Sequence, residues 1–241
     1  MSSAGILIIG NEILSGKVND TNSPFLFRNL RKLGVDVQQM ATILDEVTLI
    51  GDMVSDYSSK FDFVFTSGGV GPTHDDVTME GVAKAFGRTL EKNSSIIARI
   101  EKAQGKPCNN SQVKMAMIPQ GASLLDGGDL WFPVVILENV YIFPGIPSLL
   151  EKKFKSIQER FRSSPFYLKR VFVNQRESDL ASALHEVLKE FPTLLLGSYP
   201  KIEEKSFKVL LTLESRDSEY LENALAALLA KLPKNTIHRI E

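Results

Sequence analysis

One short stretch of the chain combines residue types that bind opposite charges. Residues 66–78, TSGGVGPTHDDVT, contain three glycines, one proline and two adjacent aspartates. Glycines at the end of a strand allow successive backbone N–H groups to converge on an anion such as a phosphate. Asp75 and Asp76 would repel that anion unless a cation lay between them. The stretch therefore predicts an anion nest from Ser67 to Val70 that also uses a divalent metal ion, Mg²⁺ or similar.

The chemistry expected of such a site is phosphoryl transfer. A hard divalent ion binds one or two carboxylates together with phosphate oxygens, and it neutralises charge that develops on phosphorus. Neighbouring residues point apart on a strand or a helix, so we expect one of Asp75 and Asp76 to face the metal and the other to orient the loop. No histidine or cysteine nucleophile is evident, which favours direct attack by water.

The same stretch also has a purely structural interpretation. The glycines could form a tight turn, and Thr73 could cap a helix that starts near Asp76. It is not a dinucleotide fingerprint, because His74 occupies the place of the third glycine, and it lacks the Gly-Lys-Ser/Thr of a P-loop. Its position after a predicted strand favours a ligand site, because α/β sheets bind ligands at the carboxyl ends of their strands.

Two other loops are predicted to reach the same edge of the sheet. A polar cluster follows the first strand, and FPGIP, Phe143 to Pro147, follows a later one. Three convergent loops predict a pocket more strongly than any one of them does. The polar cluster comprises Asn11, Glu12, Asp20, Thr21 and Asn22.

The elements that position these loops alternate along the chain. The apolar run GILIIG is typical of a strand buried on both faces. Ser23 and Pro24 predict the start of a helix that ends at Gly34. Further strands are predicted at 35–43 and 61–67, a hairpin at Val134–Leu137 and Val140–Phe143, and helices at 45–60, 78–87, 93–106 and 147–161. This order predicts an α/β fold with a mostly parallel sheet and helices on both faces.

Residues 108–132 are predicted to be rich in loops, with a turn at Gly127-Gly128. In the helix near 150, Lys152, Lys153 and Lys155 lie off the apolar stripe, and we predict that they form a solvated face.

The pattern changes after the linker Arg162 to Pro165. Strands are predicted at 169–174, 193–199 and 207–215, with helices at 178–191 and 218–232. This β-α-β-β-α order predicts a small α+β domain. We therefore expect two domains, residues 1–164 and 165–241.

Composition narrows the possible partners. The 241 residues carry a net charge of −1 and are 43% hydrophobic, which excludes a strongly basic nucleic-acid-binding surface. The single cysteine, Cys108, cannot form an internal disulfide and favours a reducing compartment such as the cytoplasm. We expect neither a signal peptide nor a membrane span, because the apolar runs are too short.

Four motifs occur in order: GNEILSGKVNDTNS at 10–23, TSGGVGPTHDDVT at 66–78, KMAMIPQGA at 114–122 and FPGIP at 143–147. Together they resemble the MoaB/Mog molybdopterin-binding domain family in its CinA-like branch. With LGSYP and VLLTLES later in the chain, the resemblance is greatest to the N-terminal region of eukaryotic FAD synthases. It implies a three-layer α/β/α core that handles pterin or nucleotide phosphates with a divalent metal.

Carried over residue by residue, the resemblance implies three walls for the site. Asp75 and Asp76 would lie at the metal, with Glu12 as a further catalytic acid, and Gly145 and Pro147 would close the third side. The residues implied in phosphate or nucleotide binding are Thr66, Ser67, Gly68, Gly69, Gly71, Thr73, Thr78, Asn11, Asp20 and Asn22. Asn11 stands where relatives often carry an aspartate, which weakens any two-metal arrangement.

Three functions remain open at this point. The first is metal-dependent hydrolysis of a dinucleotide pyrophosphate bond, with FAD as the favoured substrate and ADP-ribose-like compounds as others. The second is a non-catalytic module that binds a flavin or molybdopterin nucleotide, and the third is adenylyl transfer to molybdopterin. The resemblance implies that FAD synthesis belongs to a separate domain, similar to PAPS reductases, which these 241 residues do not include.

We also expect self-association, because the resemblance implies homo-oligomers and the sequence has more apolar positions than one sheet requires. Light scattering at micromolar protein concentration should give a multiple of the 26.8 kDa chain mass. A monomeric mass would contradict this prediction.

Overall fold

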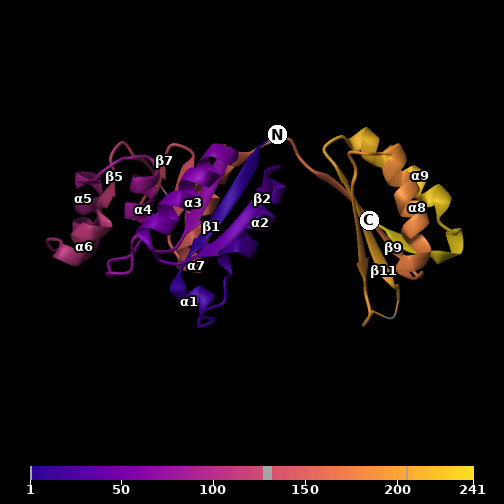
Figure 1. The fold of residues 1–241 in the computed structure, drawn as a ribbon, viewed down its shortest axis with the longest axis horizontal. Helices are drawn as coiled ribbons and strands as arrows, with labels where there is room; N and C mark the ends of the chain where they lie inside the picture. The colour runs from indigo at the N-terminus through magenta and orange to yellow at the C-terminus, as the bar shows by residue number, and fades with distance from the viewer. Residues whose placement is uncertain (1, 127–131, 205) are drawn as a thin grey trace. The chain divides into compact units, whose positions relative to one another are not determined.

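The computed structural model describes residues 2–126, 132–204 and 206–241. The chain divides into two compact units, Met1–Ser163 and Ser164–Glu241, which are described separately. The first unit contains a mostly parallel sheet between helices, and the second contains an antiparallel sheet covered by helices (Figure 1). These observations confirm the predicted fold class. The predicted turn at Gly127-Gly128 lies outside the described residues.

The first unit is organised around a six-stranded sheet in the order β2-β1-β3-β8-β7-β6. The parallel part consists of β2, β1, β3 and β8, while β7 runs antiparallel to β8. The hairpin β7–β8 has the predicted bounds. The strands are β1 Ser3–Ile9, β2 Asp36–Ile43, β3 Phe63–Ser67, β6 Ser123–Leu125, β7 Val134–Leu137 and β8 Val140–Phe143.

Helices cover both faces of this sheet, because strand residues on both faces are apolar. Along β1, Leu7 and Ile9 pack on one face with helices α3 and α4, whereas Ile6 and Ile8 pack on the other with α2 and α7. A strand with this alternation is buried on both sides, as its continuous apolar run predicts. The helices are α2 Asn22–Lys32, α3 Val47–Lys60, α4 Thr78–Ala85 and α7 Pro147–Ile157, and the short α1 spans Asn11–Leu14.

The start of α2 differs from the prediction. Ser23 does not cap this helix, because it lies inside the first turn. The carboxylate of Asp20 accepts hydrogen bonds from the backbone N–H groups of Asn22 (2.9 Å) and Ser23 (3.1 Å). Asp20 therefore provides the acceptor for the free N–H groups at the helix start.

The segment predicted to be rich in loops contains more regular structure than expected. Helix α6, Asn110–Met115, begins with a capping box formed by Asn109 and Gln112. Strand β5, Met117–Pro119, pairs with β4, Leu90–Lys92. Together with α5, Ser94–Gln104, these elements lie side by side near α4 (Figure 1). Helix α5 was predicted, whereas α6, β4 and β5 were not, because each of these three is only a few residues long.

The second unit contains one strand that the sequence pattern did not predict. Its sheet has the order β10-β11-β9-β12, and β12, Ile237–Ile240, pairs antiparallel with β9. The order is therefore β-α-β-β-α-β rather than β-α-β-β-α. The other elements are β9 Tyr167–Val173, α8 Glu177–Glu190, β10 Leu195–Pro200, β11 Val209–Ser215 and α9 Ser218–Lys231. Helices α8 and α9 lie side by side and pack on the sheet (Figure 1).

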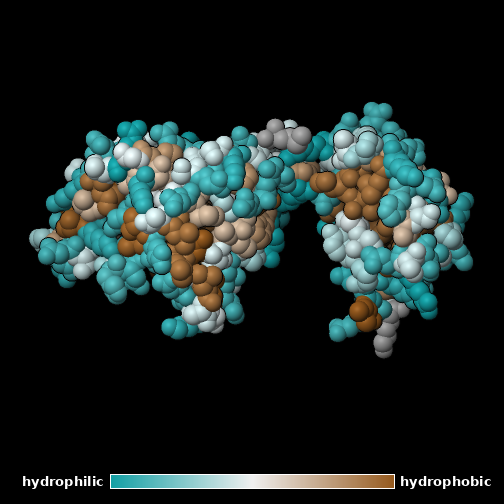
Figure 2. All heavy atoms as spheres, in the orientation of Figure 1, coloured by the Kyte–Doolittle hydropathy of each residue, from teal (hydrophilic) through white to brown (hydrophobic). Residues whose placement is uncertain are grey.

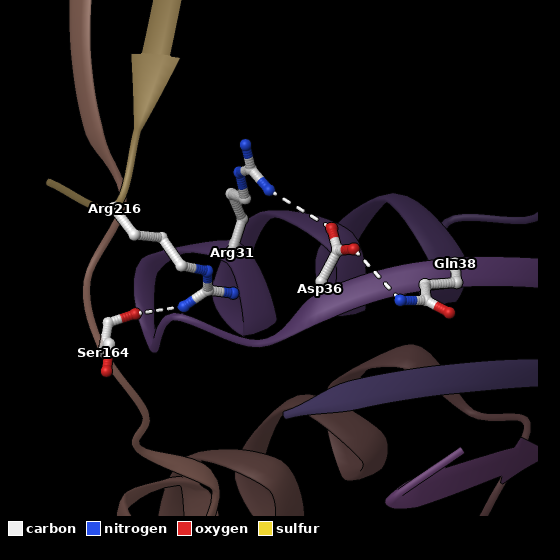
Figure 3. A network of polar contacts seen from close by, with 5 residues as sticks. All are labelled: Arg31, Asp36, Gln38, Ser164 and Arg216. Carbon is white, nitrogen blue, oxygen red and sulfur yellow. Dashed lines mark hydrogen bonds and ion pairs between the residues drawn. The ribbon is translucent and has the colours of Figure 1, made fainter. Parts of the chain in front are cut away.

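Figure 3 shows polar contacts within each unit. In the first unit Arg31 pairs with Asp36 (3.3 Å), and Gln38 donates to the same carboxylate (Figure 3). In the second unit the guanidinium of Arg216 donates to the carbonyl oxygen of Ser164 (Figure 3).

We expect a broad-specificity protease to cleave first near Ser163-Ser164, because Ser164 and Pro165 are exposed and lie between two separate cores. Mass spectrometry of early fragments should give pieces that end close to this bond. Early cleavage inside helix α2, with the boundary resistant, would contradict the two-unit organisation.

No helix in the described part of the chain has the length and apolar character needed to cross a membrane.

Candidate functional site

A cavity of about 420 Å³ lies at the carboxyl ends of the parallel strands. It is bordered by the loop after β1, the loop after β3 and the turn after β8, which are the three segments expected to converge. Its lining consists of Glu12, Gly68, Gly69, Val70, Gly71, Pro72, Asp76, Met79, Met115, Phe132, Ile142, Pro144, Gly145, Ile146, Leu149 and Lys153. The cavity therefore has polar groups at the strand ends and apolar groups along the rest of its wall.

The glycine loop, defined here as residues 68–77, joins β3 to α4. Gly68 and Gly69 have φ angles of 109° and 61°. Residues that carry a Cβ atom rarely adopt such positive angles. The N–H of Gly68 donates to the carbonyl oxygen of Phe143 (3.2 Å), so it cannot serve an anion. In the described part of the chain, the N–H groups of Gly69, Val70 and Gly71 have no acceptor. The N–H groups without an acceptor therefore belong to residues 69–71, which overlap the predicted nest of Ser67 to Val70 only at residues 69 and 70.

The far end of the glycine loop is fixed by Thr78. This fully buried residue donates its hydroxyl to the carbonyl oxygen of Gly68 (2.8 Å) and its N–H to that of Gly69 (3.0 Å). Helix α4 begins at Thr78 rather than near Asp76, and Thr73 does not cap it. The hydroxyl of Thr78 therefore holds the loop in shape.

The two adjacent aspartates of the loop have different surroundings. Asp76 is half-buried, lines the cavity and accepts a hydrogen bond from the N–H of Thr73 (2.8 Å). Asp75 is more exposed, with 60% of its side-chain surface accessible, and its carboxylate lies 3.9 Å from Nδ1 of His74. Of this pair, only Asp76 lies on the cavity wall.

A further carboxylate, which the sequence analysis missed, lies behind the glycine loop. Asp45 accepts a hydrogen bond from the N–H of Asn11 (2.8 Å). Burial is the main cause that raises the pKa of Asp45, and the nearby charges of Glu12, Asp75 and Asp76 raise it further. These carboxylates create a negative potential that a cation would relieve. Asn11 orients Asp45 and does not line the cavity.

Asn22 connects the three convergent loops. Its side-chain amide donates to Ser67 Oγ (2.9 Å) at the end of β3 and to the carbonyl oxygen of Gly145 (2.7 Å) in the turn after β8. Gly145 packs closely, because a Cβ atom there would lie 3.4 Å from the Cα of Gly68. The buried amide of Asn22 therefore sets the separation of the loops.

We expect Asn22→Ala to lower the free energy of unfolding by about 1–3 kcal/mol, because it leaves buried polar partners without hydrogen bonds. Urea denaturation followed by circular dichroism measures this difference. The control is Asn19→Ala, at an exposed position in the loop before this helix, which should change stability by less than about 0.5 kcal/mol. Equal effects of the two substitutions would show that the hydrogen bonds of the Asn22 side chain contribute nothing to stability.

Lys153 contradicts the prediction of a solvated lysine face. It is only 4% exposed, although Lys152 and Lys155 are exposed as predicted. Its ammonium donates to the carbonyl oxygens of Phe132 (2.6 Å) and Pro133 (2.8 Å) and lies 4.9 Å from the centre of the Phe132 ring. Burial lowers the pKa of Lys153 to about 8.

The structure brings together most of the residues predicted for the site. Of these, Glu12, Gly68, Gly69, Gly71, Asp76 and Gly145 line the main cavity. A second cavity of about 60 Å³ shares Glu12 and Gly145 and is also lined by Asp20, Asn22, Ser67 and Pro147. The predicted residues that line neither cavity are Asn11, Thr66, Thr73, Asp75 and Thr78. Thr66 is fully buried within β3.

The carboxylates on the cavity wall suit a divalent ion that is also bound by a ligand. Among the described residues, no group of three or more acidic, histidine or cysteine side chains is arranged to hold a metal alone. Mg²⁺ does not require such a group, because it commonly binds one or two carboxylates, phosphate oxygens and water. Glu12 and Asp76 supply carboxylates on the wall of the cavity that also presents the free N–H groups.

A parallel sheet with a glycine loop and a cavity at its strand ends defines an α/β domain of the class that binds small ligands at this edge. Residues 5–163 match the family described as a probable molybdopterin binding domain, and residues 165–241 match the middle domain of FAD synthase. The chain belongs to the family described as a probable molybdopterin binding domain, and its residues 165–241 are similar to the middle domain of FAD synthase. The family resemblance noted in the sequence is confirmed.

Individual relatives agree with this assignment. The chain is 36% identical over 254 residues to a probable FAD synthase of Caenorhabditis briggsae and 34% identical over 221 residues to a protein of Archaeoglobus fulgidus. It covers 48% of the first relative and 93% of the second, so it spans about half the length of that FAD synthase. The crystal structure of CinA from Thermoplasma acidophilum is 30% identical, with a TM-score of 0.62, over 67% of this chain and 100% of the other.

Proposed function

We propose that the first unit hydrolyses the pyrophosphate bond of a dinucleotide in a metal-dependent reaction, with FAD as the favoured substrate. The observation that carries the proposal is one cavity that combines the free N–H groups of residues 69–71 with the carboxylates of Glu12 and Asp76. The N–H groups would attract a phosphate, whereas the two carboxylates would repel it. A divalent ion between them reconciles the two.

Each part of the site would have a distinct task. The N–H groups of residues 69–71 would bind a phosphate oxygen, as backbone nests do. Glu12 and Asp76 would hold the metal, whose chemistry is to neutralise charge that develops on phosphorus. Thr73 would keep Asp76 aimed at the cavity, because its N–H donates to that carboxylate. Catalysis would rest on positioning and electrostatics, which dominate phosphoryl transfer.

The proposed reaction uses water as its only co-substrate. The oxygen of water forms a new bond to one phosphorus of the pyrophosphate, and the bond from that phosphorus to the bridging oxygen breaks. The bridging oxygen remains on the other phosphate, and the two hydrogens of water leave as protons, to solvent or to the product phosphates. FAD would yield FMN and AMP, and an ADP-ribose-like compound would yield AMP and a sugar phosphate. FAD is favoured because the second unit matches a domain of FAD synthase.

The experiment is incubation of the purified chain with FAD in the presence of Mg²⁺, Mn²⁺ or Co²⁺, and with EDTA, followed by chromatography. The expected result is equal amounts of FMN and AMP with at least one metal and none with EDTA. ADP-ribose tested in parallel defines the preferred substrate. Absence of product from both substrates with all three metals would refute the proposed hydrolysis.

A second candidate function is nucleotide binding without turnover. It is favoured by the small number of acids at the site, because Glu12 and Asp76 are the only carboxylates among the described residues that line the main cavity. This candidate predicts that flavin nucleotides bind, as measured by calorimetry, while no FMN or AMP accumulates. The incubation with metals therefore distinguishes the two candidates.

A further inference from the structure

We infer that Lys153 binds the hydrogen-bond-accepting edge of the ligand's heteroaromatic ring, and so selects ligands that carry a ring such as a flavin. This inference rests on the proposed function only in placing a dinucleotide in the main cavity. It concerns recognition of the ring and does not depend on hydrolysis.

The contacts of Lys153 leave one donor for a ligand. An ammonium group has three N–H donors. Two of them meet the carbonyl oxygens of Phe132 and Pro133. In the described part of the chain the third has no hydrogen-bond acceptor, and the Phe132 ring lies 4.9 Å from Nζ. Lys153 also lines the main cavity, although only 4% of the residue is exposed. A buried cation with an unused donor beside a cavity is expected to serve a ligand, because an unpaired buried charge is costly.

The neighbours of Lys153 favour a flat ring over a phosphate. Phe132, Leu149 and Met115 line this part of the cavity with apolar surface. An aromatic ring gains from burial against such side chains, whereas a phosphate loses hydration there. Burial is the only cause that shifts the pKa of Lys153, and no nearby carboxylate compensates its charge.

The position of Lys153 separates it from the phosphate end of the site. The glycine loop follows β3, whereas Lys153 is bonded to residues that immediately precede β7, and β8 lies between these two strands. Two strand spacings correspond to about 10 Å. A phosphate on the glycine loop would therefore be one sugar or polyol away from the group that meets Lys153. In a dinucleotide that group is the ring.

The chemistry of the contact distinguishes possible rings. The pyrimidine end of an oxidised flavin carries two carbonyl oxygens, each close to an unprotonated nitrogen, and a positive charge beside these acceptors alters the electronic properties of the ring. Adenine has no carbonyl and carries an amino donor. The geometry thus favours a flavin, or a pterin with its own carbonyl, at the apolar end of the cavity.

The test compares binding of riboflavin, FMN and AMP to the wild-type chain, Lys153→Met and Lys152→Met, measured by flavin fluorescence and calorimetry. Lys152→Met is the matched control, because this substitution removes the same charge from an exposed neighbouring position. We expect Lys153→Met to weaken riboflavin and FMN binding by about 10- to 100-fold, the loss typical of one charged hydrogen bond. AMP binding should change by less than about twofold, and Lys152→Met should behave as wild type.

Thermal melting separates a binding role from a structural one. We expect Lys153→Met to melt at or above the wild-type temperature, because methionine fills the same space without a buried charge. The inference is overturned by equal weakening of AMP and FMN, by unchanged flavin affinity, or by failure of the wild-type chain to bind riboflavin and FMN. Flavin binding that depends on Lys153 without release of AMP from FAD would instead refute only the proposed hydrolysis.

Discussion

Asp76→Asn is expected to lower the rate of AMP release from FAD by about 100-fold or more, because it removes one of two carboxylates proposed to hold the metal. Electrostatic stabilisation is the main catalytic contribution available to this site, and losing one such group typically costs that much. The substitution keeps the shape of the side chain, and its amide oxygen can still accept from Thr73. The rate should be measured at saturating Mg²⁺ with chromatographic detection of AMP.

Asp75→Asn is the matched control for this prediction. Asp75 is the adjacent residue and carries the same charge, but it is exposed and does not line the cavity. We expect it to retain at least about a third of the wild-type rate, because an exposed charge near the site has a weak, screened effect. Both variants should melt within a few degrees of the wild type. Full activity of Asp76→Asn, or an equal loss in both variants, would remove Asp76 from the proposed metal site.

Gly68→Ala is expected to lower the free energy of unfolding by about 3 kcal/mol or more. A Cβ atom on Gly68 would lie 2.0 Å from the carbonyl oxygen of Ile9, which belongs to the backbone of the central strand β1. The φ angle of 109° adds strain that glycine alone avoids. Neither the strand nor the loop can move without breaking the sheet at the site. Urea denaturation of the whole chain measures the loss.

Gly87→Ala shows how much of this loss comes from the backbone angle alone. Gly87 follows α4 with a φ of 61°, and a Cβ atom there would meet nothing within 4 Å. We expect it to cost about 1–2 kcal/mol, the usual penalty for alanine in the left-handed region. If Gly68→Ala cost no more than this control, the close approach of the glycine loop to β1 would not be a real constraint.

The sequence was sufficient to predict the sheet and the edge at which the site lies. Continuous apolar runs such as residues 5–9 are typical of strands buried on both faces, and the glycines after β3 and β8 mark where those strands end. Because parallel strands present their carboxyl ends together, the convergence of Glu12, Asp76 and Gly145 followed from topology. The hairpin β7–β8 could be predicted residue by residue because Glu138-Asn139 interrupts an otherwise apolar run.

The sequence was not sufficient to predict contacts that depend on tertiary packing. Lys153 has the periodicity of an exposed helix face, and only the two carbonyl oxygens before β7 make its burial possible. Asp45 follows β2 without any motif, and its role depends on its contact with Asn11. Strand β12 is four residues long and its two isoleucines are three positions apart, so its sequence has no period-two apolar pattern that would predict the pairing with β9.

The most direct test of the shared metal is the effect of Mg²⁺ on the affinity for α,β-methylene-ADP, a pyrophosphate analogue that resists hydrolysis, measured by calorimetry. If one ion is held jointly by phosphate and Asp76, Mg²⁺ should tighten binding at least about tenfold, and the nucleotide should tighten Mg²⁺ binding by the same factor. This coupling should disappear in Asp76→Asn and persist in Asp75→Asn. Equal affinity with Mg²⁺ and with EDTA would contradict the account.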